Sequence, residues 1–202
     1  MSDIAENYAR VLSQVEACAK RAGRSAESVR LIAVSKTRRL EEVQALLNLG
    51  QLAFGENTIQ DAMTKIPALS STPAEWHFIG HLQSKKAGRL PGYFQWVHSV
   101  DSLKLAQKLS SAMLSKAPNT RLNCLIQVNV SGEATKSGLQ PHELGAFMEA
   151  LSGLSLPGLH WRGLMTIGVK GNESETRAAF AHLRRLQQSC QSEYGLPDFD
   201  QL

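Results

Sequence analysis

Two kinds of segment alternate along the chain. The longer ones carry an apolar residue at every third or fourth position, which is typical of an amphipathic helix. Between them lie short continuous apolar runs with β-branched members, which are typical of strands buried on both faces. The predicted strands cover residues 31–34, 52–54, 76–79, 94–98, 122–130 and 159–165, and a seventh begins at Phe199. The predicted helices cover residues 4–23, 40–50, 83–89, 102–113, 141–151 and 176–190, and one more opens after Asn57.

This alternation of strands and helices with short loops predicts parallel βαβ units and an α/β fold. Both an open doubly wound sheet and a (β/α)8 TIM-type barrel fit the pattern. No glycine-rich GxGxxG turn follows the first strand, which weakens the dinucleotide-binding version of the open sheet. We find neither an internal repeat nor a linker. We therefore expect one domain over residues 1–202, with residues 1–23 as an extra N-terminal helix.

Composition narrows the class of protein without naming a function. The chain has 202 residues, 43% of them hydrophobic, and a net charge of +4 from scattered basic pairs. A nucleic-acid binder usually shows a basic stripe or a known motif, and neither is present. The cysteines, Cys18, Cys124 and Cys190, have no metal-ligand or disulfide spacing. With a polar start and no long apolar stretch, the chain is expected in the cytoplasm, without membrane or nucleic-acid contacts.

Polar residues follow the predicted strands directly, at the end where parallel α/β folds gather their reactive groups. Lys36 follows the first strand. Desolvation at the mouth of the core would favour its neutral amine, the form that Schiff-base chemistry with an aldehyde requires. The alternative is a lysine that extends into solvent. Asn57 follows the second strand, either as a ligand-binding amide or as a simple helix cap.

The other candidate residues are weaker on position alone. Lys136, Ser137 and Gly138 share a loop after the fifth strand that suits an anion or a phenolate oxygen. The histidines have no HxH or HExxH spacing, so we expect no metal site. Neither Ser35 nor Ser137 lies in the GxSxG context of an acyl-transfer nucleophile.

Taken in order, these segments resemble the pyridoxal phosphate homeostasis protein family. The resemblance is carried by collinear motifs over essentially the whole chain: LIAVSKT at 31–37, FGEN at 54–57, WHFIGHLQSKK at 76–86, IQVNV at 126–130, KSG at 136–138 and RGLM at 162–165. The family is similar in fold to the barrel domain of alanine racemase. The resemblance therefore implies a fold-type III pyridoxal phosphate (PLP) barrel with PLP as the cofactor.

The resemblance also implies roles for particular residues. Lys36 corresponds to the lysine that holds PLP as a Schiff base, and Asn57 lines the cofactor pocket. Lys136 stands where alanine racemase has an arginine near the phenolic oxygen of the cofactor. Ser137 is its neighbour, and Met165 ends the sixth strand beside the ring. No residue is assigned a catalytic role, because the family implied is a PLP carrier in intracellular PLP homeostasis without robust catalytic activity.

The alternative function is a fold-type III amino-acid racemase, which needs acid/base groups on both faces of its substrate. Tyr8, Tyr93 and Tyr194 do not follow a predicted strand, and the second domain that carries the racemase tyrosine has no room here. A nucleic-acid-associated α/β protein is a third and weaker reading. As partners we expect PLP and PLP-dependent client enzymes, and we expect a monomer.

The sequence departs from the family pattern at its end. The family continues with segments that provide phosphate-binding loops and an arginine facing the pyridine nitrogen, whereas this sequence stops at Leu202. We therefore expect that the last βα units of the barrel are absent from this chain. The intact protein should extend beyond Leu202 by about thirty residues, the size of the missing units.

Overall fold

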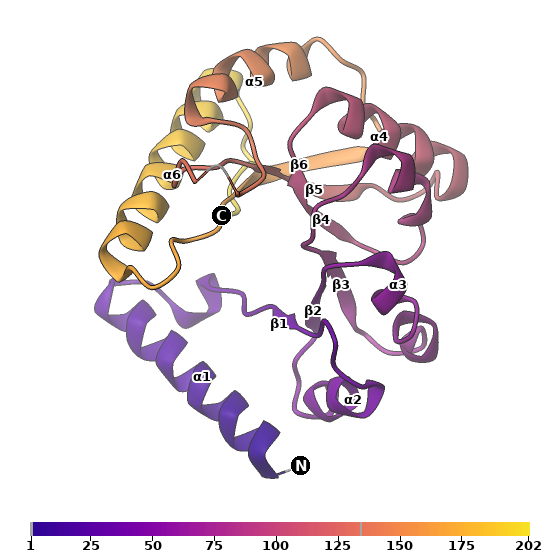
Figure 1. The fold of residues 1–202 in the computed structure, drawn as a ribbon, viewed down its shortest axis with the longest axis vertical. Helices are drawn as coiled ribbons and strands as arrows, with labels where there is room; N and C mark the ends of the chain where they lie inside the picture. The colour runs from indigo at the N-terminus through magenta and orange to yellow at the C-terminus, as the bar shows by residue number, and fades with distance from the viewer. Residues whose placement is uncertain (1, 134) are drawn as a thin grey trace. The chain divides into compact units, whose positions relative to one another are not determined.

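The computed structural model describes residues 2–133 and 135–202, and it separates into two compact units that meet in sequence at Trp76 and His77. Strands and helices alternate in both units (Figure 1). The strands are β1 (Ala33–Val34), β2 (Ala53–Glu56), β3 (Glu75–Phe78), β4 (Trp96–Val100), β5 (Leu122–Gln127) and β6 (Leu159–Met165). The α-helices are α1 (Ser2–Arg21), α2 (Leu40–Asn48), α3 (Ile59–Ala62), α4 (Leu103–Lys116), α5 (Leu144–Ser152) and α6 (Glu173–Tyr194). Short 3-10 helices are η1 (Ala26–Ser28), η2 (Ile66–Leu69), η3 (Ser84–Arg89) and η4 (Pro141–Glu143).

The strands form a parallel sheet whose order follows the chain, β1-β2-β3-β4-β5-β6. The predicted α/β class is therefore confirmed. A doubly wound sheet reverses its strand order at a switch point, whereas a barrel winds in one direction. Because the observed order has no reversal, it favours the barrel over the open alternative.

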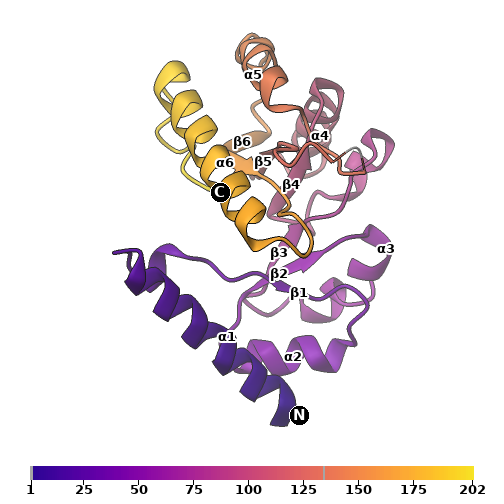
Figure 2. The same ribbon diagram turned by 60° about the vertical axis from the view of Figure 1, so that its left-hand side comes forward.

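In the first unit, helix α1 packs against α2 (Figure 2). The predicted N-terminal helix is confirmed over its described residues, and Gly23 follows it with the positive φ of 65° that suits a helix end. Strand β1 is shorter than predicted, because regular pairing begins only at Ala33. Val34 is 48% exposed, so the expectation of a strand buried on both faces is wrong for β1.

In the second unit, every residue of β4 is buried, and helix α6 packs against β6. Ser102 caps α4 by accepting a hydrogen bond from the Leu105 amide. Where the start of a seventh strand is predicted at Phe199, the described residues form an isolated parallel bridge instead, between Gln201 and Gly163 of β6. Phe199 is fully buried, and the Gln201 amide donates to the Arg162 carbonyl at 2.8 Å.

Three local predictions need correction. The cap of α3 is Thr58, whose hydroxyl accepts from the Asp61 amide, so Asn57 does not serve as that cap. The segment predicted as a helix at 83–89 is the 3-10 helix η3. Phe180, which the apolar spacing with Ala179 and Leu183 predicts on the inner face of α6, is 50% exposed. Among the described residues, no helix is both long enough and apolar enough to span a bilayer.

A buried histidine in β4 predicts a pH dependence of stability. Burial lowers the pKa of His98 to about 4, and its Nε2 lies 2.9 Å from His77 Nδ1. The unfolded chain binds a proton at His98 near its ordinary pKa of about 6.5, so folding stability should fall as the pH drops from about 6.5 towards 4. We expect a loss of about 3 kcal/mol over this window from this group.

Urea unfolding at several pH values between 7 and 4 would measure this loss. The variant His98→Gln cannot take up that proton and should show a flatter dependence of unfolding free energy on pH. An equal slope in the variant and the wild type would assign the acid sensitivity to other groups.

Candidate functional site

Lys36 lies in a tight turn directly after β1. The turn is closed by a hydrogen bond of 3.0 Å from the Arg38 amide to the Ser35 carbonyl, with Lys36 and Thr37 between them. The Lys36 side chain is exposed, and no hydrogen bond or ion pair joins its ammonium to any residue that the structure describes. The expected desolvation of this lysine is therefore wrong. Its amine is open to solvent because β1 ends before it and residues 36–39 are all exposed.

Asn57 follows β2 as Lys36 follows β1. The two strands run parallel with Val34 opposite Gly55, and the Ser35 amide donates to the Gly55 carbonyl at 2.9 Å. Both predicted residues therefore lie at the carboxyl ends of paired strands, where an α/β fold places its reactive groups. Asn57 is half-buried, and its side-chain amide forms no hydrogen bond with any described residue.

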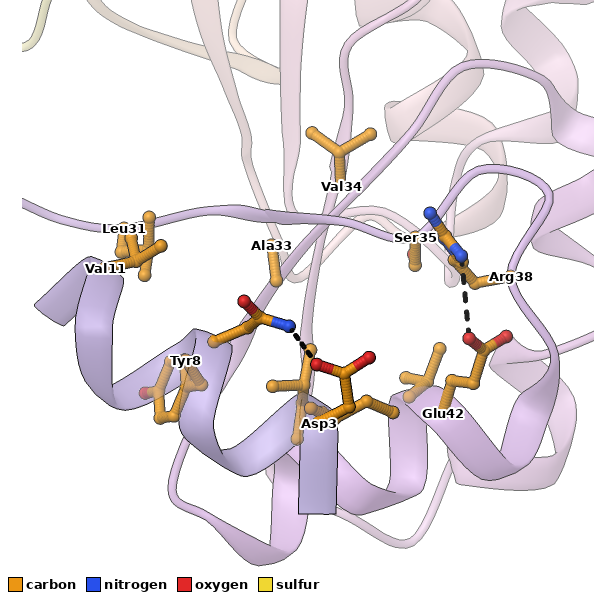
Figure 3. A pocket seen from close by; sticks show the side chains of 13 residues that line it. Asp3, Tyr8, Val11, Leu31, Ala33, Val34, Ser35, Arg38 and Glu42 are labelled. Atoms are coloured by element: carbon orange, nitrogen blue, oxygen red, sulfur yellow. Dashed lines mark hydrogen bonds and ion pairs between the residues drawn. The ribbon is translucent and has the colours of Figure 1, made fainter. Parts of the chain in front are cut away.

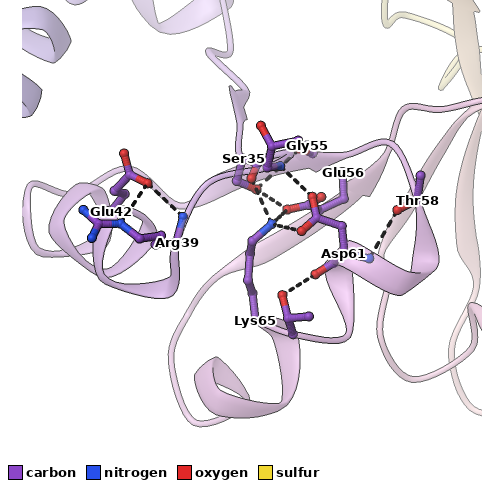
Figure 4. A network of polar contacts seen from close by, with 10 residues as sticks. Ser35, Arg39, Glu42, Gly55, Glu56, Thr58, Asp61 and Lys65 are labelled. Carbon is purple, nitrogen blue, oxygen red and sulfur yellow. Dashed lines mark hydrogen bonds and ion pairs between the residues drawn. The ribbon is translucent and has the colours of Figure 1, made fainter.

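Behind this turn lies a buried ionic cluster formed by Lys65, Glu56 and Asp61 (Figure 4). Lys65 Nζ donates to Glu56 Oε1 and Asp61 Oδ1, both at 2.8 Å, and to the Ser35 carbonyl at 2.9 Å. The Ser35 hydroxyl also donates to Glu56 Oε1, at 2.7 Å. The side chains of Lys65 and Glu56 are 2% and 0% exposed, so these ionic contacts form away from solvent.

The contacts within the cluster keep Lys65, the second lysine near β1, in its charged form. Burial raises the pKa of the Glu56 carboxyl, against the effect of its bonds to Lys65 and Ser35. Burial also disfavours the Lys65 ammonium, but its bonds to Asp61 and Glu56 outweigh this and raise the pKa of Lys65. Desolvation opposes the charged form of Asp61, yet the bonds from Lys65 and from the Thr37 amide lower the pKa of that carboxyl. Lys65 is therefore held as an ammonium by its two carboxylate partners, whereas the Lys36 side chain has no partner among the described residues.

The predicted Lys136 lies in the second unit, in a loop that folds back along β5. Its Nζ donates to Glu133 Oε1 at 2.5 Å, to the Gly168 carbonyl at 2.8 Å and to Ser131 Oγ at 3.4 Å. The bond to Gly168 joins this loop to the segment after β6. Lys136 is thus held between the carboxyl ends of β5 and β6, and each of its three N–H donors already has an acceptor.

Ser137 and Met165 lie at the same ends of the second unit. The Ser137 carbonyl accepts a bond of 3.0 Å from Gln127 Nε2, and its side chain is exposed. Gly138 allows the loop to approach β5, because a Cβ there would lie 3.0 Å from the Gln127 carbonyl at a φ of 121°. Met165 ends β6 half-buried, and its carbonyl accepts from the Val128 amide at 2.8 Å. The structure therefore groups the predicted residues as Lys36 with Asn57 in one unit, and as Lys136 with Ser137 and Met165 in the other.

A cavity of about 520 Å³ lies in the first unit among α1, β1 and α2 (Figure 3). Apolar side chains such as Val11 and Leu31 line it together with the polar Asn7, Arg38 and Glu42. None of the predicted cofactor-binding residues lines this cavity. It does reach the end of β1, because Val34 and Ser35, the two residues before Lys36, also line it.

The ionic cluster is not among the sites that the sequence predicts. Two signals were available, the acidic Glu56 at the end of an apolar strand and the i, i+4 pair of Asp61 and Lys65. Both also occur on ordinary solvent-exposed surfaces, which is why they did not stand out. Within the described ranges, no three His, Cys, Asp or Glu side chains gather as a metal site requires.

Similarity to known proteins identifies the family of this chain. The family model described as the alanine racemase N-terminal domain matches residues 7–198. The pyridoxal phosphate homeostasis protein of Pseudomonas aeruginosa is 46% identical over 187 residues, which cover 92% of this chain and 80% of that protein. The solved structure of PipY from Synechococcus elongatus with PLP bound is 31% identical, with a TM-score of 0.76 and coverage of 92% of this chain and 85% of that one.

Alanine racemase from Corynebacterium glutamicum is a more distant neighbour. It superposes with a TM-score of 0.65 at 20% identity, covering 96% of this chain and 52% of that one, so the likeness concerns the fold alone. The homeostasis protein, in contrast, shares nearly half of its aligned residues over most of both chains. This chain therefore belongs to the pyridoxal phosphate homeostasis protein family, built on the fold of the alanine racemase N-terminal domain.

Proposed function

We propose that this protein binds PLP and takes part in intracellular PLP homeostasis, holding the cofactor as a Schiff base on Lys36, without robust catalytic activity. The observation that carries the proposal is the contrast between the two lysines near β1. Lys65 is buried and committed to Glu56 and Asp61, whereas Lys36 ends in solvent with no described partner. The relatives named for PLP homeostasis and the PLP-bound PipY structure support the same choice of ligand.

The residues present fit such a ligand. PLP supplies an aldehyde, which a neutral lysine amine can capture. The Lys36 amine would form a C=N bond with the aldehyde carbon, and the aldehyde oxygen would leave as water. Asn57, also without a described side-chain partner, has a donor and an acceptor to offer to a polar ligand beside it. The exposed position of Lys36 also leaves it accessible to a cofactor that must be taken up and released.

On the family resemblance, we also propose Lys136, Ser137 and Met165 of the second unit as cofactor-binding residues. Lys136 can give one N–H to a cofactor oxygen only by releasing a present acceptor. The bond of 3.4 Å to Ser131 Oγ is the longest of its three and the least costly to lose. The ion pair with Glu133 at 2.5 Å would remain and would keep the ammonium in place. The exposed hydroxyl of Ser137 and the half-buried Met165 complete this assignment.

A carrier fits the structure better than the racemase alternative. Racemisation needs a second acid/base group opposite the lysine, a role that tyrosine plays in alanine racemase. Tyr8 donates to Gln51 Oε1 at 3.2 Å, and Tyr194 donates to the Gly145 carbonyl at 3.3 Å. Tyr93 precedes β4 and so lies at the amino end of that strand. Each tyrosine is therefore bound elsewhere or lies at the wrong end of the sheet, and we propose a non-enzymatic role.

We also propose that PLP-dependent client enzymes receive the cofactor, and that the protein acts as a cytoplasmic monomer. The three cysteines support a reducing compartment, because all of them are free thiols, Cys18 exposed and Cys124 and Cys190 buried. Light scattering of the purified protein would test the monomer. A stable dimer would contradict it.

The central test uses the unmodified protein and PLP. Mixing the two should produce the visible absorption band of a protonated Schiff base, and borohydride reduction should fix the cofactor to one lysine. Peptide mapping by mass spectrometry is expected to find the added mass on the peptide that contains Lys36. A label spread over the exposed lysines, such as Lys85, or the absence of any label would contradict the proposed function.

A further inference from the structure

The peptide units on both sides of Lys36 are tied to the same buried cluster. The Ser35 carbonyl accepts from Lys65 Nζ at 2.9 Å, and the Thr37 amide donates to Asp61 Oδ2 at 2.7 Å. Lys65 and Asp61 are themselves joined by an ion pair of 2.8 Å. These contacts form a closed ring of hydrogen bonds around the backbone of Lys36. The ring leaves the Lys36 side chain untouched.

Thr37 shows that this turn is under constraint. Its φ is 61°, and among the described residues it is the one non-glycine residue with a positive φ. A β-branched side chain is strongly disfavoured in this left-handed region, so such a conformation persists only where the surroundings hold it. The bond from the Thr37 amide to Asp61 is a contact that can hold it, because it engages the strained residue itself.

Packing alone does not require charged side chains in this cluster. A buried ion pair is often no more stabilising than apolar residues of the same volume, because both charges lose their hydration. Here Glu56 is completely buried, and its Oε2 has no hydrogen-bond partner among the described residues. Ionic groups do offer directional bonds to a chosen carbonyl and amide. This cluster directs two such bonds to the neighbours of Lys36.

We propose that Lys65, Glu56 and Asp61 are positioning residues that hold the Lys36 turn from behind β1 and thereby prepare its amine to capture an aldehyde. Lys65 and Asp61 grip the two flanking peptide units, and Glu56 fixes Lys65 through Oε1, which also accepts the Ser35 hydroxyl. The inference rests on the proposed function, because Lys36 must capture PLP for its positioning to matter.

The main variant is Asp61→Asn, since the Asp61 side chain is 28% exposed and its change should leave the fold intact. One amide oxygen cannot replace two carboxylate oxygens, so the hydrogen bond to Lys65 or the one to the Thr37 amide is lost. We expect PLP capture, followed by the growth of the visible band in stopped flow, to slow by roughly 10- to 100-fold, the scale of a misplaced reacting group. Hydrogen exchange at the Thr37 amide should become faster in the same variant.

A second variant separates positioning from stability. Lys65→Met with Glu56→Met replaces the buried pair by unbranched apolar side chains of similar length and should stay folded. It removes the bond to the Ser35 carbonyl, so we again expect capture slowed by roughly tenfold or more. The matched control is Glu42→Gln. It alters a carboxylate that accepts from the Arg39 amide at 2.8 Å, three residues beyond Lys36, and should capture PLP at the wild-type rate.

The outcomes distinguish this inference from the proposed function. If the wild type captures no PLP on Lys36, the proposed function fails. If the wild type captures PLP and both folded cluster variants do so at the same rate, the positioning role is wrong while the proposed function stands. If Glu42→Gln slows capture as much as Asp61→Asn, loss of negative charge explains the effect, and the positioning role is again wrong.

Discussion

Replacing Lys36 with alanine is expected to abolish covalent PLP binding. The variant should show no visible Schiff-base band at any PLP concentration, and borohydride should leave no cofactor mass on the protein. The reason is that the remaining lysine near β1 cannot substitute. Lys65 is 2% exposed and held as an ammonium by Glu56 and Asp61. The fold should be unaffected, because the Lys36 side chain is exposed and makes no described polar contact.

Two further variants make this result specific. Lys36→Arg keeps the positive charge but cannot form a Schiff base, because a guanidinium stays protonated in proteins. It should therefore lose the visible band while retaining whatever affinity arises from charge, which isothermal titration calorimetry would measure. Lys104→Ala removes an exposed lysine from α4 and should bind PLP like the wild type. A full Schiff-base band in Lys36→Ala would place the cofactor on another lysine.

Among single substitutions in the ionic cluster, Lys65→Met is expected to cause the largest loss of folding stability. Lys65→Met leaves Glu56 in a fully buried site without its counter-ion, and breaking a buried ion pair in this way costs about 3–5 kcal/mol. The Ser35 carbonyl loses a hydrogen bond at the same time. The free energy of unfolding in urea at pH 7 would measure the loss. The remaining carboxyl should take up a proton more readily, so the deficit should shrink as the pH falls.

The paired change Lys65→Met with Glu56→Met should recover most of that loss. With both charges removed, no buried carboxylate is left without a counter-ion, and apolar replacement of buried ion pairs is often neutral. Arg30 and Glu75 form a matched surface pair at 2.6 Å, with 47% and 27% of their side chains exposed. Removing Arg30 should change stability by less than about 1 kcal/mol. A single Lys65→Met variant as stable as the wild type would show that the cluster is not energetically coupled.

Much of the fold could be predicted from the sequence, because the signals involved are local. Apolar spacing distinguishes helices from strands within a few residues, and the predicted strand at 159–165 coincides with β6. Helix ends also depend on neighbours in sequence, as Ser102 before α4 and Gly23 after α1 show. The positions of two candidate site residues could be predicted from local signals in the same way. Lys36 and Asn57 come directly after strands, and parallel strands bring such positions to one edge.

Only the tertiary structure decided what each charged residue does. In the sequence, Lys65 is one basic residue among many, and nothing near it shows that it is buried. Its bond to the Ser35 carbonyl joins residues thirty positions apart and depends on the register between β1 and β2. Asp61 likewise accepts the amide of Thr37, the residue with the positive φ, from twenty-four positions further along the chain. Solvation favours a surface position for any single charge, so a buried cluster forms only where the fold brings several complementary groups together at once. The sequence by itself thus determined which lysine follows the first strand, and the packing of Lys65, Glu56 and Asp61 decided which groups bind the peptide units on either side of it.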